Sequence, residues 1–79
     1  MDIMDKILEI LDEVRPDVDF ENEKLLIDDG ILDSFDIITI VSSFNDEFDV
    51  EIDVEDLEPY NFNTVEAMKE LIEKLQNED

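Results

Sequence analysis

The sequence GILDSFDIITIVSSFNDEF, residues 30–48, decides how this chain folds. It opens with the only glycine of the protein, reaches the pair Asp33 and Ser34, and continues with apolar residues that recur at three- and four-residue spacing. This spacing predicts an amphipathic helix from about Ser34 to Phe48. Asp33 is placed to cap the helix, and Asp36 occupies the position of the acidic partner in a capping box.

The two sides of this predicted helix differ in character. The side that we expect in the core carries Ile37, Ile40, Val41, Phe44 and Phe48. The opposite side gathers Phe35, Ile38, Ser42, Asn45 and Asp49. The helix therefore leaves two sizeable apolar side chains on an otherwise polar, acidic surface.

Phe35 and Ile38 have two interpretations. They form either an exposed docking surface beside Ser34 or part of the core, and in the second case docking moves toward Ser42 and Asn45. Acidic side chains on the same helix would steer partners that carry basic patches. The residues expected to contact a partner are Phe35, Asp36, Ile38, Ser42, Asn45 and Asp46.

Helical spacing also occurs near both ends of the chain. Apolar residues recur from Ile3 to Val14, and Pro16 disfavours helical geometry at the residue before it, so the first helix should end there. Thr64 is placed to cap a last helix whose apolar stripe ends at Leu75.

Other segments lack this spacing. Residues 16–32 mix acids with apolar residues, so we expect a long loop with a helical turn near residues 23–26, held to the core by its apolar side chains. Its Gly30 favours a backbone position with positive φ just ahead of the next helix. The alternating residues 48–52 have no second strand to pair with.

One further short element is expected before the last helix. Asp53 is placed to cap a turn over residues 54–57, which Pro59 stops. Tyr60 and Phe62 then carry the chain across the core. The sequence therefore predicts an all-α fold of four helices, one of them short, with a long loop after the first.

Size and charge narrow the function. Residues 1–79 suffice for a single domain with one apolar core. A net charge of -21, from 26 acidic and 5 basic residues, argues against binding nucleic acid or anionic membranes. No apolar run reaches membrane-spanning length and no secretion signal is evident, so we expect a cytoplasmic monomer.

The composition also bears on catalysis. The chain has no His and no Cys, so no base or thiol is at hand to activate the Ser34 hydroxyl. We therefore expect no catalytic residue, and we interpret Ser34 as a place to be modified. Asp17, Asp19 and Glu21 match the first positions of an EF-hand loop, but Asn22 stands where that loop needs Gly, so no metal site is expected.

These features together resemble the acyl carrier protein family. The family's Asp-Ser-Leu attachment motif appears here as Asp33-Ser34-Phe35, and the similarity includes Gly30-Ile31-Leu32, Phe48 and Thr64. The segment Asn61-Phe62-Asn63-Thr64, with Phe35 in place of Leu, is more similar to D-alanyl carriers and stand-alone carriers of synthase-type pathways than to the fatty acid carrier.

The resemblance implies a cofactor and partners. A phosphopantetheinyl transferase would attach 4'-phosphopantetheine, taken from coenzyme A, to Ser34 beside Asp33. A loading ligase would then place an acyl or aminoacyl group on it as a thioester, for presentation to pathway enzymes with basic patches. Fatty acyl, polyketide and D-alanyl cargo all remain open, and the alternative is an acidic protein-interaction module without a prosthetic group.

Two expectations concern how such a site would behave. The helix dipole attracts a phosphate, but Asp33 and Asp36 offset it, and no Lys or Arg is expected nearby, so the phosphate should not be held tightly. Phe44, Tyr60 and Phe62 are bulky enough to fill the space between the second and third helices. Small or polar cargo is therefore expected before a long lipid.

Overall fold

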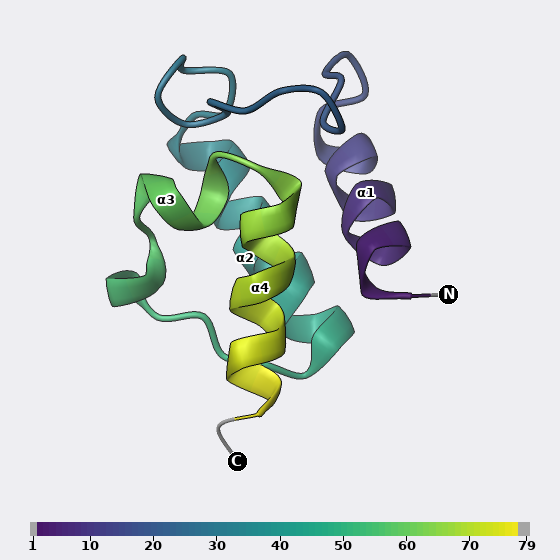
Figure 1. Ribbon diagram of the computed structural model, residues 1–79, viewed down its shortest axis with the longest axis vertical. Helices are drawn as coiled ribbons and strands as arrows, with labels where there is room; N and C mark the ends of the chain where they lie inside the picture. Colours follow the sequence, from purple (N-terminus) through teal and green to yellow (C-terminus); the bar gives the residue numbers. More distant parts are fainter. Residues whose placement is uncertain (1, 78–79) are drawn as a thin grey trace.

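Four α-helices and one short 3-10 helix make up the part of the chain that the computed structural model describes, residues 2–77. Their bounds are α1 (Ile3–Val14), α2 (Ser34–Phe48), η1 (Val54–Asp56), α3 (Pro59–Phe62) and α4 (Val65–Gln76). No strand occurs in the described residues, and the predicted all-α class is confirmed. The long loop after α1 crosses one end of the bundle, where α2 begins (Figure 1).

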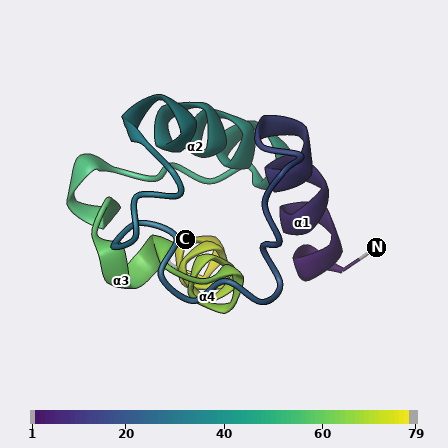
Figure 2. The ribbon, with the colours of Figure 1, turned by 90° about the horizontal axis from the view of Figure 1, so that it is seen from above.

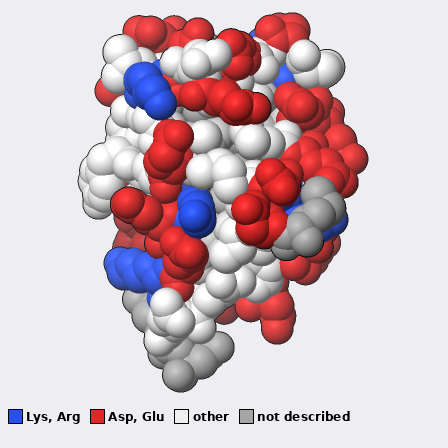
Figure 3. Space-filling view, turned by 45° about the vertical axis from the view of Figure 1, so that its right-hand side comes forward, with Lys and Arg blue, Asp and Glu red and all other residues white. Residues whose placement is uncertain are grey.

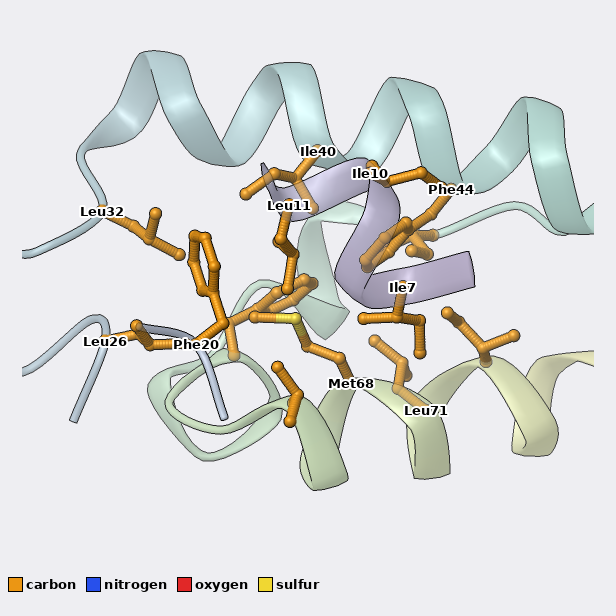
Figure 4. Close-up of a cluster of buried hydrophobic side chains, with 14 residues drawn as sticks. Ile7, Ile10, Leu11, Phe20, Leu26, Leu32, Ile40, Phe44, Met68 and Leu71 are labelled. Atoms are coloured by element: carbon orange, nitrogen blue, oxygen red, sulfur yellow. The ribbon is translucent and has the colours of Figure 1, made fainter. Parts of the chain in front are cut away.

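The helices lie around one apolar core. α1 contacts both α2 and α4, and the view from above shows α1, α2 and α4 on different sides of a common centre (Figure 2). Ile40 and Phe44 project from α2 toward Met68 and Leu71 of α4 (Figure 4). All four side chains are buried, and burial of each stabilises the fold by about 1.5 to 3 kcal/mol. The predicted core side of α2 is therefore confirmed.

The loop after α1 is anchored in this core. Phe20, Leu26 and Leu32 come from residues 15–33, and all three are buried with the helical side chains (Figure 4). The prediction that apolar side chains hold this loop to the core is therefore confirmed, except at Leu25, which is 45% exposed. No helix within residues 2–77 combines the length and the apolar character needed to cross a bilayer.

Side-chain caps explain where the helices begin. The carboxylate of Asp2 accepts a hydrogen bond from the N–H of Asp5 at 2.9 Å, and the Thr64 hydroxyl accepts one from Ala67 at 3.0 Å. These bonds satisfy N–H groups that have no partner within the helix. α1 ends at Val14, as Pro16 predicts.

The predicted helical turn at residues 23–26 is wrong. Turns lie on either side instead: Glu23 N–H donates to Asp19 O at 3.1 Å, and Asp29 N–H donates to Leu25 O at 2.9 Å. Between them the N–H of Leu26 bonds to Asn63 O at 3.1 Å. This long-range bond draws the chain toward the start of α4, so residues 23–26 do not coil locally.

The segment after η1 also differs from the prediction. Residues 59–62 form α3, since Pro59 occupies its first turn, where the fixed φ of proline suits a helix and its missing N–H is not needed. Phe62 is buried, but Tyr60 is 72% exposed, so the expectation that Tyr60 crosses the core is wrong. At 3.6 residues per turn, two residues that are two positions apart point to nearly opposite sides of a helix.

Candidate functional site

Ser34 is the first residue of α2, and its side chain is exposed. The predicted capping box is present around it: Asp33 accepts from the N–H of Asp36 at 2.9 Å, and Asp36 Oδ2 accepts from the N–H of Asp33 at 3.2 Å. Gly30 has a φ of 71°, as predicted, and turns the chain just ahead of the helix. No hydrogen bond made within residues 2–77 uses the Ser34 hydroxyl, which leaves this oxygen open to an outside enzyme.

Arg15 brings a positive charge to this helix start. Its Nη1 donates to Asp36 Oδ2 at 2.9 Å and to the carbonyl oxygen of Ile31 at 3.0 Å. The prediction that no Lys or Arg lies near the site is therefore wrong. Arg15 and Asp36 are 21 residues apart, and their pairing depends on the end of α1 lying beside the start of α2, which local spacing does not reveal.

A second carboxylate holds the other edge of the guanidinium. Arg15 Nε donates to Asp17 Oδ1 at 3.2 Å, and Nη2 donates to Asp17 Oδ2 at 3.3 Å. The hydrogen bond from Arg15 lowers the pKa of Asp17. The hydrogen bond to Asp17 raises the pKa of Arg15 most, and the bond to Asp36 raises it further. The guanidinium therefore stays positively charged.

The outer side of α2 presents apolar side chains to solvent. Phe35 is 81% exposed and Ile38 is 64% exposed, so neither belongs to the core. Ser42 and Asp46 are also exposed. We call these four residues the outer face of α2. Acidic side chains cover much of the molecular face seen in Figure 3, with Lys and Arg between them.

Two other predicted contact residues, Asn45 and Asp36, make side-chain contacts within the fold. Asn45 is half-buried, and its carboxamide oxygen accepts from the N–H of Ile52 at 3.0 Å. Asp49 ends α2 in the left-handed conformation, with a φ of 52°, and the chain turns back toward Asn45. The expectation that Asn45 lies on the open side is therefore corrected. Asp36 has a side chain only 15% exposed, in its ion pair with Arg15.

Asn63 supports the site from the far end of the chain. Its side-chain oxygen accepts from the N–H groups of Ile27 at 2.9 Å and Asp28 at 3.1 Å, and its Nδ2 donates to Asp28 at 3.0 Å. These bonds fix the loop that leads into α2. The sequence marked the segment around Asn63 only through resemblance, and nothing local predicts a bond across 36 residues.

Two hollows lie near the start of α2. A polar one of about 510 Å³ has Arg15, Gly30 and Asp33 in its wall. An apolar one of about 70 Å³ lies between α2 and α3, with Ile37 and Phe62 in its wall. Within residues 2–77, no three His, Cys, Asp or Glu side chains converge in a way that could hold a metal ion.

Comparisons with known proteins identify a family for this chain. A family model described as "Phosphopantetheine attachment site" matches residues 2–72. The acyl carrier protein of Buchnera aphidicola is 38% identical over 53 residues, which cover 67% of this chain and 65% of that protein. The D-alanyl carrier protein of Streptococcus mutans is 31% identical over 78 residues, or 98% of this chain and 99% of the relative. That of Streptococcus gordonii is 28% identical over the same shares.

Proposed function

The chain belongs to the phosphopantetheine-attachment family of acyl carrier proteins, and on that premise we propose that Ser34 is the residue that carries 4'-phosphopantetheine. The protein is a phosphopantetheine-bearing carrier of acyl or aminoacyl groups and not an enzyme. Family membership decides against the alternative of an acidic interaction module without a prosthetic group. When bound, the group supplies a terminal thiol on which the cargo is held as a thioester.

The exposed, unengaged hydroxyl at the start of α2 is the observation that carries this proposal. The other hydroxyls near the site are less suited to modification. Thr39 donates to the carbonyl oxygen of Phe35 at 3.0 Å, and Thr64 caps α4. Ser43 is half-buried in the middle of α2, and Ser42, although exposed, lies about two turns away from the helix N-terminus. Ser34 combines exposure with a helix N-terminus, where backbone N–H groups and the helix dipole favour a phosphate.

The charges around Ser34 are compatible with a phosphodiester at this position but do not bind it tightly. The exposed Asp33 opposes a second negative charge. Asp36 would do the same, but Arg15 lies 2.9 Å from its carboxylate and offsets its charge. Arg15 already has carboxylate partners of its own, so we expect the phosphate to remain mobile at the helix start.

The outer face of α2 is the proposed docking surface. Phe35 is adjacent to Ser34 and offers an apolar contact, and the surrounding acids favour enzymes with basic patches. The phosphopantetheinyl transferase and a loading ligase are the partners that we propose for it. Residues 1–79 would act as one carrier domain, and a cytoplasmic location stays a prediction.

The size of the apolar cavity supports a small cargo. About 70 Å³ is roughly half the volume of an apolar cavity that holds one benzene molecule, which is about 150 Å³. A long acyl chain would have to displace Ile37 or Phe62 to enter. The D-alanyl carrier relatives align over nearly the whole chain, which supports an aminoacyl cargo as the first to test.

The test is modification in vitro. The purified protein is incubated with coenzyme A and a broad-specificity phosphopantetheinyl transferase, and intact mass is measured. We expect the wild-type protein to gain one phosphopantetheinyl group and Ser34→Ala to gain none. The free energy of unfolding of Ser34→Ala should differ from that of the wild type by no more than about 1 kcal/mol, because Asp33 and not Ser34 caps α2.

The matched control is Ser43→Ala, which removes another hydroxyl from α2 and should leave the mass gain unchanged. A Ser34→Ala protein that still gains the group would overturn the proposal. A wild-type protein that gains nothing under conditions that modify a known carrier would overturn it as well.

A further inference from the structure

Arg15 connects three separate parts of the chain. It directly follows α1 as the C-cap residue, and its guanidinium contacts Asp17 in the loop, Ile31 near the end of the loop and Asp36 in the first turn of α2. Four of its five N–H groups are used in these contacts. Its side chain is 32% exposed. These contacts connect the end of α1 to the loop and to the start of α2.

Two of its partners lie on either side of Ser34. The carbonyl of Ile31 precedes the serine by three positions, and Asp36 follows it by two. Asp36 Oδ2 also closes the capping box, since it accepts from the N–H of Asp33 at 3.2 Å. The same oxygen therefore joins Arg15 to the residue directly before Ser34.

We propose that Arg15 is a positioning residue for the modification of Ser34. By holding Ile31 and Asp36 it fixes the chain on both sides of the serine, so that the hydroxyl meets the transferase in one geometry. Lysine cannot replace it, because a single ammonium lacks the planar fork that reaches two acceptors at once. This inference rests on the proposed function, in which Ser34 is the attachment residue.

The experiment compares steady-state modification by a phosphopantetheinyl transferase, below the melting temperature of each variant. Arg15→Gln and Arg15→Lys should lower kcat by about ten-fold or more, since a displacement of about 1 Å at a reacting group costs about 10²-fold. The KM for the carrier should stay within about two-fold, because the outer face of α2 is intact. A purely stabilising role for Arg15 would leave kcat unchanged.

The matched control is Lys6→Gln. Lys6 pairs with Glu47 at 3.7 Å, far along α2 from Ser34, and its side chain is 33% exposed, close to that of Arg15. The substitution changes the net charge by the same amount as Arg15→Gln. It should leave kcat at the wild-type value, and a loss equal to that of Arg15→Gln would show a general charge effect and overturn the inference.

A second measurement does not require modification. Amide hydrogen exchange at Asp33, followed by NMR, should become faster in Arg15→Gln and stay unchanged in Lys6→Gln. If Arg15→Gln does not fold, Asp36→Asn gives the same test from the other partner, because asparagine keeps the capping oxygen and loses the charge. The double variant Arg15→Gln/Asp36→Asn should be no slower than either single variant.

The failures are distinguishable. If Arg15→Gln or Arg15→Lys is modified at the wild-type kcat, the positioning role is overturned while attachment at Ser34 stands. If Ser34→Ala is still modified, the proposed function itself fails, whatever Arg15 does.

Discussion

The side-chain oxygen of Asn63 lies 2.9 Å from the backbone nitrogen of Ile27, and the two residues are 36 positions apart. This bond ties the loop that leads into α2 to the segment that leads into α4. A backbone N–H in a half-buried loop needs a partner, and here one amide side chain serves Ile27 and Asp28 together. The position of Ser34 therefore depends in part on a residue near the other end of the chain.

Replacing Asn63 with Ala should destabilise the protein by about 2 kcal/mol, because the Ile27 N–H is left without a partner. Urea unfolding with an unchanged slope measures the effect. The control is Asn22→Ala, since the side chain of Asn22 makes only an exposed bond to Asp19, and it should cost no more than about 0.5 kcal/mol. Equal losses of stability in the two variants would show that the bond between Asn63 and Ile27 does not stabilise the fold.

Two left-handed residues should respond to substitution in opposite directions. Gly30→Ala should destabilise by about 1 to 2 kcal/mol through backbone strain alone, because φ is 71° and an added Cβ meets nothing within 4 Å. Asp49→Gly should stabilise by up to about 1 kcal/mol, since Asp49 holds a φ of 52° at the C-cap of α2. Thermal unfolding of both variants would reveal the signs, and a stabilised Gly30→Ala would refute the strain argument.

The helices could be predicted from the sequence because their signals are local. α1, α2 and α4 combine apolar residues at helical spacing with a polar cap. α2 and α4 begin where Asp33 and Thr64 predict, and α1 ends before Pro16 as expected. The loop could not be predicted in the same detail. Its turns are set by the bond between Leu26 and Asn63, which no local pattern encodes. The sequence does not reveal α3, because proline both stops one helix and suits the first turn of the next.

The candidate site shows the same division. The exposure of Ser34 at a capped helix start follows from neighbours within three residues, so the sequence revealed it. The sequence does not reveal that Arg15 lies near Ser34, because the pairing of Arg15 with Asp36 depends on the packing of α1 against α2. The same limit applied to Asn45, whose bond to Ile52 depends on how the chain leaves α2.

Phe35 offers a direct test of the proposed docking surface. Phe35→Ser should change the free energy of unfolding by no more than about 0.5 kcal/mol, since the side chain is 81% exposed. It should raise the transferase KM for the carrier by about five-fold or more, as expected when an exposed aromatic anchor is lost from an interface. Tyr60→Ser is the control, because Tyr60 is 72% exposed on α3 and should leave KM unchanged. Equal KM values for the two variants would remove Phe35 from the interface.

Asp17 should titrate below the usual aspartate pKa of about 3.9, because the Arg15 guanidinium donates to its carboxylate. A lowered folded-state pKa contributes stability that is present above the unfolded pKa and is lost as the pH falls through the folded value. The stability difference between wild type and Asp17→Asn should therefore shrink toward acid pH. NMR titration measures the pKa directly, and in Arg15→Gln it should return toward the usual value. An unchanged pKa in that variant would show that Arg15 is not the cause.

The length of the cargo should leave the stability of the carrier unchanged. The cavity between α2 and α3 has a volume of about 70 Å³, so most of an eight-carbon chain would lie outside it. Each methylene that did enter the cavity would add about 0.8 kcal/mol to the stability of the loaded carrier. Carriers loaded from acetyl- and octanoyl-coenzyme A should therefore melt at nearly the same temperature. Phe62→Ala enlarges the cavity and should make the octanoyl form melt higher than the acetyl form. A higher melting temperature for octanoyl-loaded wild type would mean that the helices open to admit the chain, and it would reverse the proposed preference for small cargo.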